Sequence, residues 1–404
     1  MENNNKITPP FLSKKKQVVN LNNPAMGIYD KWLQTWPVLG AAYNEARKRF
    51  SQMEGILGIG IGRKYKESTK AYGLIPYATG GLCIKILVER KKRPAHKKER
   101  IPSSIYVTVN NDRKRVPLDV MSVGDDKDDS PIVTRMNDGR GWPVAGSIQP
   151  GRLFAFGVKT ADQINAEFPE SKEEVRLGTT GAIVHFGDET YYGISAGHIF
   201  TDPCVPDPVR PHGIRAIGAL GNNWVEVTGE GFYPPTIKSG DWIRDVMLFP
   251  VPQPLKPDIE TISWPPDFTR ELATPEDIDY AVQAETATGF VWIDRGGDFP
   301  EAIPVDLEAG FPLFETQVGC FSGAVKTLTY RMTWPLRFTD ERQNTMGGDS
   351  GAPVFLYTGE GDGCRLLGFH FMESTNDSYS FAMDAGSFFR EVLLSTPGED
   401  VWFC

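Results

Sequence analysis

Long hydrophobic runs are missing from this sequence. Its 404 residues contain no stretch of the roughly 18 consecutive apolar residues that a membrane-spanning helix requires. The first thirty residues also lack the apolar centre of a secretory signal. We therefore expect a cytoplasmic protein with no membrane partner.

Cysteine and histidine are scarce, with 5 of each in the chain. No two cysteines have the Cys-x-x-Cys spacing, and no histidine is spaced as a zinc co-ligand. These patterns disfavour both a disulfide scaffold and a zinc module. We expect reduced thiols, no metal and no cofactor.

Charge of one sign is concentrated at one end of the chain. The net charge of -9 conceals a segment, residues 1–124, with 23 Lys and Arg against 9 Asp and Glu, so this segment carries +14 and the remainder carries -23. Its most basic tract, 89–100, has no interleaved aromatic residues on which bases could stack. We therefore do not expect nucleic acid as a partner. We expect two modules, with the basic one a candidate surface for a regulatory partner.

Glycine and proline are abundant, with 41 and 31 residues. This content favours many short strands and turns over long helices. From about residue 179 short apolar runs alternate with turns, which is typical of an antiparallel sandwich or barrel. A segment with helical spacing near residues 387–394 closes this region.

The sequence divides into four parts. We expect a flexible tail over 1–24, a small basic α+β domain over 25–124, a charged linker over 125–140 and a mainly β domain over 141–404. In the second part, helical spacing predicts a helix from Trp36 to Met53 that Pro37 interrupts or kinks. Alternating apolar residues predict strands, which begin near residues 56, 81, 105 and 116.

Two peptides carry residues suited to covalent chemistry, Ser195-Ala-Gly-His198 and Gly348-Asp-Ser350-Gly-Ala-Pro. A serine hydroxyl becomes an effective nucleophile when an imidazole takes its proton and a carboxylate orients that imidazole. The glycines around Ser350 permit a tight turn that aims the amides of Gly348 and Ser350 at one point, where an oxyanion develops.

These peptides resemble the motifs of trypsin-like (chymotrypsin-fold) serine peptidases, of the intracellular, mainly prokaryotic kind with an extra N-terminal domain. A third family motif, Asp-Ile-Ala-Leu-Leu, is best matched by the peptide that begins at Asp245. The resemblance implies a mainly β, chymotrypsin-like double β-barrel, preceded here by the α+β domain. It also implies a catalytic triad of His198, Asp245 and Ser350, with an oxyanion hole formed by Gly348 and Ser350.

Two alternatives stay open at this point. Asp241 precedes Asp245 by four residues and is a second candidate to orient His198. The peptide around Ser350 also approximates the nucleophile elbow of α/β-hydrolases, which requires its histidine after the serine. In this chain His370 is the one histidine that follows Ser350.

The resemblance places two residues in the primary specificity pocket. Asn344 corresponds to the base of the pocket, and Glu373 stands where many family members have a glycine in the wall strand that pairs with substrate. Either the pocket is shallow, or Glu373 selects a basic side chain, or Glu373 points to solvent.

The expected function is hydrolysis of peptide bonds in protein or peptide substrates through an acyl-enzyme, under some form of regulation. One alternative is a latent or inactive protease-fold protein that binds peptides as a scaffold. Hydrolysis of esters by the same three residues is another.

Overall fold

The computed structural model describes residues 37–63, 82–88, 100–122, 135–136, 179–186, 190–199, 214–217, 224–227, 238–239, 242–250, 264–284, 288–293, 300–308, 310–319, 325–340, 343, 345, 349–358, 363–374, 379–395 and 401–403. Outside these ranges lie the predicted tail, most of the predicted linker and the basic tract at 89–99. Asp241, Asn344 and Gly348 also lie outside them.

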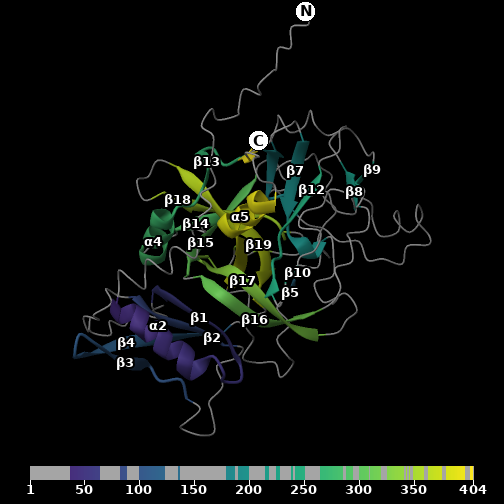
Figure 1. The fold of residues 1–404 in the computed structure, drawn as a ribbon. Coiled ribbons are helices and arrows are strands. Elements are labelled where there is room, and N and C mark those ends of the chain that lie inside the picture. The colour runs from purple at the N-terminus through teal and green to yellow at the C-terminus, as the bar shows by residue number, and fades with distance from the viewer. Residues whose placement is uncertain are drawn as a thin grey trace, which may run out of the picture.

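The first described element of the N-terminal module is the helix α2 (Pro37–Phe50) (Figure 1). Pro37 is its first residue, which agrees with the predicted interruption at this proline and not with a kink inside the helix. A proline at this position loses no helical hydrogen bond, because the first amides of a helix have no partner within it. One face of the helix is buried and packs on a sheet; it consists of Leu39, Ala42, Tyr43, Ala46 and Phe50.

The sheet beneath this helix has four strands in the order β1-β2-β4-β3. Their bounds are β1 (Ile56–Arg63), β2 (Leu82–Val88), β3 (Ser104–Val109) and β4 (Asp112–Ser122). β3 and β4 form a hairpin that turns at Asn110 and Asn111, both with positive φ. Asparagine tolerates that backbone conformation better than most residues. The prediction of a small α+β module is confirmed.

The C-terminal half contains a closed, six-stranded antiparallel barrel. Each strand pairs with the next, and the sixth returns to the first. In order around the barrel they are β14 (Gly289–Ile293), β15 (Glu301–Leu307), β17 (Val325–Phe338), β20 (Tyr379–Asp384), β19 (Cys364–Glu373) and β18 (Pro353–Tyr357).

Further elements surround this barrel. β16 (Phe311–Gly319) pairs with β17, and β13 (Phe268–Leu272) and β5 (Arg135–Met136) pair with β19. β10 (Lys238–Ser239) pairs with β11 (Trp242–Ile243), which in turn pairs with β17. Among the described residues of this half, the α-helices are α4 (Pro275–Gln283) and α5 (Ala385–Ser395). Within the described ranges, no helix is long and apolar enough to span a bilayer.

A separate four-stranded antiparallel sheet has the order β12-β7-β6-β21. It consists of β6 (Ala182–Phe186), β7 (Thr190–Ser195), β12 (Met247–Pro250) and β21 (Val401–Phe403). A hairpin of β8 (Ile214–Ile217) and β9 (Trp224–Val227) lies on the same side of the molecule (Figure 1). The prediction of a mainly β protein is confirmed. Where a second barrel was expected, the described residues form this open sheet.

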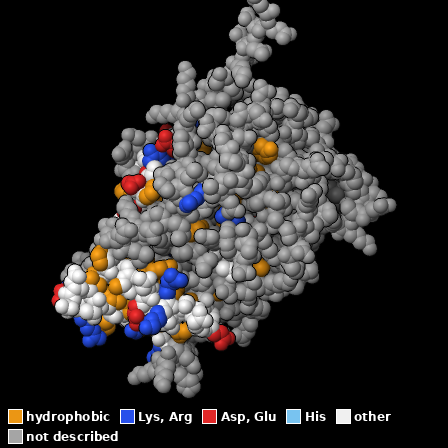
Figure 2. All heavy atoms as spheres, in the orientation of Figure 1, with side chains coloured by type: hydrophobic (Ala, Val, Ile, Leu, Met, Phe, Trp, Pro, Cys, Tyr) orange, Lys and Arg blue, Asp and Glu red, His pale blue; other side chains and the backbone are white. Residues whose placement is uncertain are grey.

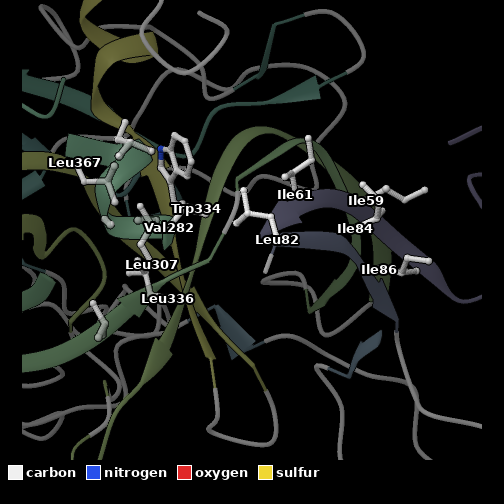
Figure 3. Packing of buried hydrophobic residues seen from close by; sticks show 14 of the residues in the cluster. Ile59, Ile61, Leu82, Ile84, Ile86, Val282, Leu307, Trp334, Leu336 and Leu367 are labelled. Atoms are coloured by element: carbon white, nitrogen blue, oxygen red, sulfur yellow. The ribbon is translucent and has the colours of Figure 1, made fainter. Parts of the chain in front are cut away.

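The N-terminal module and the barrel share one hydrophobic core. Figure 3 shows isoleucines of β1 and β2 on one side and Leu307, Trp334 and Leu336 of the barrel on the other. The α/β-hydrolase alternative is wrong, because its doubly wound parallel sheet is incompatible with an antiparallel barrel.

A buried group of charges joins the same two parts, and we refer to Lys85, Asp119, Glu308 and Arg337 as the Lys85 cluster. The Lys85 ammonium on β2 is fully buried and lies 2.7 Å from Asp119 Oδ2 and 3.0 Å from Glu308 Oε2. Glu308 follows β15 and lies 3.6 Å from Arg337 Nε. The basic module is therefore docked on the barrel by an ion pair as well as by apolar packing.

Other basic side chains of this module face solvent. Arg47 and Lys48 on α2 and Arg113 and Arg115 on β4 are exposed, and Figure 2 shows lysine and arginine side chains at this end of the molecule. The prediction of a basic surface is confirmed for this described part. The four-part division of the chain, with its boundaries, stays a prediction.

Candidate active site

His198 sits in a short 3-10 turn, Gly197–Ile199, directly after β7. Its side chain is 2% exposed. The preceding Ser195 is also buried and donates its hydroxyl to the carbonyl oxygen of Thr179 at 2.7 Å. Ser195 thus holds the end of β7 in place, which fixes the backbone from which His198 projects.

Asp245 lies between β11 and β12 and is fully buried. One carboxylate oxygen accepts a hydrogen bond from the backbone N–H of His198 at 2.7 Å, and the other lies 2.8 Å from His198 Nδ1. Because a carboxylate is an acceptor, this contact places the proton of a neutral imidazole on Nδ1 and leaves Nε2 as the acceptor. Of the two candidate aspartates, the structure brings Asp245 to His198; Asp241 lies outside the described residues.

Ser350 lies in the turn that leads into β18, and its hydroxyl oxygen is 3.1 Å from His198 Nε2. The Ser350 side chain is fully buried in this structure. The three predicted triad residues are thus in hydrogen-bonding distance in the order Asp245, His198, Ser350. We refer to them as the His198 cluster.

Gly351 fixes the shape of the Ser350 turn. Its φ is +98°, a conformation that side-chain-bearing residues rarely adopt. A Cβ added there would lie 2.1 Å from the Thr179 carbonyl oxygen and 2.3 Å from Ser195 Oγ. The absence of a side chain therefore lets the serine turn approach the segment that supports His198.

Backbone hydrogen bonds join the same segments. The N–H of Thr179 donates to the Ser350 carbonyl at 2.7 Å, and the N–H of Gly351 donates to the His370 carbonyl at 2.7 Å. The first bond ties the turn to the start of the open sheet, and the second ties it to β19 of the barrel. The His198 cluster is therefore assembled where these two sheets meet.

Two buried polar residues surround the Asp245 side of the cluster. Tyr330 on β17 is opposite Ile243 in the β11–β17 pairing. Burial raises the pKa of the Tyr330 hydroxyl well above its ordinary value, and the negative charge of Asp245 raises it further. The Tyr330 hydroxyl therefore stays neutral beside the charge of Asp245.

The neighbour of Asp245, Arg244, is linked electrostatically to α5. Asp384 accepts hydrogen bonds from Trp334 Nε1 at 2.8 Å and from the backbone N–H and hydroxyl of Ser387. Burial raises the pKa of Asp384, while its hydrogen bonds and the positive charge of Arg244 act in the opposite direction. The positive charge of the buried Arg244, the residue before Asp245, therefore acts on Asp384 at the end of β20, directly before α5.

Glu373 at the end of β19 is 7% exposed, so the alternative that it points to solvent is wrong. Its Oε2 accepts a hydrogen bond from the hydroxyl of Thr345 at 3.1 Å. Thr345 lies five residues before Ser350 and was not predicted as a site residue. Its neighbour Asn344 and the oxyanion-hole residue Gly348 lie outside the described residues, so their roles stay predictions.

The described residues contain no group of three or more His, Cys, Asp or Glu side chains placed to hold a metal. The expectation that no metal or cofactor is used stays a prediction. Two of the five cysteines, Cys83 and Cys364, are described; both are buried free thiols, as expected. Burial raises the pKa of the Cys364 thiol to about 12, with a further contribution from Asp267.

No family model and no curated protein matches this chain. Among solved structures, it is similar to the NS6 protease of murine norovirus 1, with 14% identity and a TM-score of 0.25 over 50% of this chain and 89% of that one. It is also similar to an inactive murine norovirus NS6 protease with a C-terminal extension, with 13% identity and a TM-score of 0.25 over 48% and 82%. A TM-score this low does not assign a fold. The barrel is instead established by the pairing of its six strands.

Proposed function

We propose that this chain is a serine endopeptidase that cleaves protein or peptide substrates through the His198 cluster. The single observation that carries the proposal is the continuous set of contacts from Asp245 through His198 to Ser350, at 2.8 Å and 3.1 Å. A serine whose hydroxyl contacts the acceptor nitrogen of an oriented histidine has the arrangement required for nucleophilic attack. The hypothesis also includes a regulatory partner that binds the basic N-terminal module, and a cytoplasmic location for the protein.

In the first step, the Ser350 hydroxyl oxygen attacks the carbonyl carbon of the scissile peptide bond while its proton passes to His198 Nε2. Asp245 stabilises the resulting imidazolium, because its carboxylate contacts Nδ1. The amides of Gly348 and Ser350 stabilise the oxyanion. The imidazolium then protonates the leaving amine as the C–N bond breaks, and an ester between Ser350 and the substrate acyl group remains.

In the second step, a water molecule loses a proton to His198 and attacks the ester carbonyl. Collapse of this intermediate releases the carboxylic acid product, and Ser350 recovers its proton from His198. We assign Asn344 and Glu373 to the wall of the primary specificity pocket. The buried Glu373 carboxylate favours a substrate with a basic residue, because burial strengthens the attraction between opposite charges.

The test is the Ser350→Ala variant. We expect it to lose both peptide hydrolysis and covalent labelling by a fluorophosphonate, with kcat reduced by about 10⁴-fold or more. The matched control is Ser103→Ala, which removes an exposed serine of the N-terminal module and leaves both readouts unchanged.

The same experiment separates the alternatives. A wild-type chain that binds peptides but is neither labelled nor active supports the latent scaffold. Labelling accompanied by ester but not peptide hydrolysis supports an esterase. Labelling that survives in Ser350→Ala contradicts the nucleophile assignment.

A further inference from the structure

The edges of β19 show which neighbours lie beside Ser350. Glu373 has two pairing partners, Ser380 of β20 and Arg135 of β5. A residue pairs with one strand on each side, so β20 and β5 lie on opposite edges of β19. Gly368 is paired at once with Asp384 of β20 and with Val354 of β18, so β18 also lies opposite β20. It follows that β18 and β5 share one edge of β19.

The Ser350 turn occupies this same edge, between β18 and β5. The pairing of β18 with β19 ends with Pro353 opposite Phe369. The next residue of β19, His370, then bonds the turn: its N–H donates to the Ala352 carbonyl at 2.8 Å and its carbonyl accepts from Gly351 N–H at 2.7 Å. Met372, the first residue paired with β5, follows two positions later, a step of roughly 7 Å along a strand.

This edge is suited to hold a peptide for attack by Ser350. Extended peptides commonly bind by adding a strand to a free sheet edge, where the backbone supplies affinity and alternate side chains supply specificity. A peptide paired with Met372 and Glu373 would run directly toward the Ser350 turn. In this structure the chain's own Arg135 and Met136 hold that position, antiparallel to β19.

We infer that Arg135–Met136 is a resident occupant of the peptide-binding edge, and that a substrate has to displace it before Ser350 can act; this inference rests on the proposed function. The ladder places Arg135 opposite Glu373. Residues of opposite charge that face each other on antiparallel strands attract. The occupant therefore has the strand direction of a bound peptide and a basic residue type at the position opposite Glu373, and a substrate with a basic residue at that position can replace it.

The first test is Arg135→Glu in the full-length chain, which places like charges opposite each other and weakens the pairing. The apparent affinity for substrate is proportional to the fraction of molecules whose site is open, and weaker pairing of the occupant raises that fraction. We therefore expect KM for a peptide substrate to fall about fivefold while kcat stays unchanged. Arg140→Glu, the same charge change five positions along the sequence, is the matched control and leaves KM unchanged. Met136→Pro, which removes a backbone donor, acts in the same direction as Arg135→Glu.

A fluorophosphonate distinguishes failure of this inference from failure of the proposed function, because so small a probe requires no strand pairing. If Ser350 is labelled in every variant while KM stays within twofold of wild type in both Arg135→Glu and Met136→Pro, the occupant is overturned and the protease is not. If Ser350 is not labelled in any variant, the proposed function fails.

A second measurement uses the occupant as a free peptide. A synthetic peptide of residues 131–140 is expected to inhibit Arg135→Glu competitively, and a scrambled peptide of the same composition is not. Replacing the arginine of residue 135 by alanine within that peptide weakens inhibition if the charge opposite Glu373 matters. Equal inhibition by the native and scrambled peptides would contradict a specific occupant.

Discussion

Two buried groups of polar side chains can be compared in this molecule, the Lys85 cluster and the His198 cluster. In the Lys85 cluster, positive and negative side chains pair with each other across the boundary between the N-terminal module and the barrel. In the His198 cluster, a single carboxylate contacts a histidine, which contacts a neutral hydroxyl. Burial alone therefore does not identify a reactive site. What differs in the His198 cluster is a histidine that lies between a carboxylate and a hydroxyl group.

The two clusters also differ in what they connect. The Lys85 cluster joins two parts that share a hydrophobic core, so we expect its loss to lower the free energy of unfolding. The His198 cluster lies where the open sheet meets the barrel, and under the proposed function its loss lowers turnover. If this division is correct, variants of the two clusters have opposite signatures.

The largest expected effect is that of Asp245→Asn on turnover. An amide can present its N–H₂ to His198 Nδ1 and so favour the wrong tautomer, and we expect kcat to fall about 10⁴-fold. Peptide hydrolysis and thermal unfolding of the same preparation measure the effect. A variant that loses activity because it unfolds would break the comparison, since the His198 cluster would then be structural as well.

The next largest effect is that of Glu308→Gln on stability. This change leaves the buried Lys85 with less negative charge, and removal of one partner from a buried ion pair typically costs about 3 kcal/mol or more. Denaturant unfolding measures it, with Glu301→Gln at the exposed start of β15 as the control. We expect fluorophosphonate labelling of the folded variant at the wild-type rate; a large decrease in that rate at full folding would show that the two clusters are coupled.

The smallest effect is a loss of stability at alkaline pH. Burial lowers the pKa of Lys85, but Glu308, Cys83, Asp119 and Tyr379 together raise it above its ordinary value. The contribution of Lys85 is therefore fully present below its unfolded pKa of about 10.4 and decreases above it, by up to about 1.4 kcal/mol for each pH unit, until the folded pKa is reached.

Lys85→Met removes this titrating group. The difference is measured from the denaturant midpoints of both proteins between about pH 8 and pH 11, a range that spans the unfolded pKa of lysine. The wild type is expected to lose more stability than the variant above the unfolded pKa. Parallel curves would mean that Lys85 does not gain its charge stabilisation from folding.

Local patterns in the sequence predicted much of the fold. The alternation of glycine and isoleucine from Ile56 placed β1, and small residues before His198 and around Ser350 marked the ends of strands. The short apolar runs did not predict the length of β17, which extends from Val325 to Phe338. Its apolar residues alternate clearly, but Pro335 lacks a backbone donor and argues against an inner strand.

Helix α4 was missed although its start carries a recognisable signal. Thr274 caps the helix by accepting from the N–H of Asp277 at 3.2 Å, and Asp277 accepts in return from the N–H of Thr274 at 2.8 Å. This reciprocal pair, with Pro275 between its members, is a known mark of a helix start. The helix was overlooked because it is short and lies in a region that strand patterns dominate.

Contacts between distant parts of the chain could not be predicted in this way. Lys85 lies in an apolar strand, and nothing near it in the sequence indicates that its partner is Glu308 in the other half of the chain. The motif order predicted His198, Asp245 and Ser350, whereas Thr345 and Tyr330 carry no motif. Their places depend on which strands pair, and that is decided by tertiary packing.

The pairing of β21 with β6 has a consequence for biosynthesis. β6 and β7 lie in the sheet that leads to His198, and its fourth strand is supplied by Val401–Phe403, 51 residues after Ser350. Phe403 also packs against Trp264 and Phe389. In the order of synthesis, His198, Asp245 and Ser350 are all made before the strand that completes this sheet. The sheet that supports His198 can therefore be completed only after Val401–Phe403 has been made.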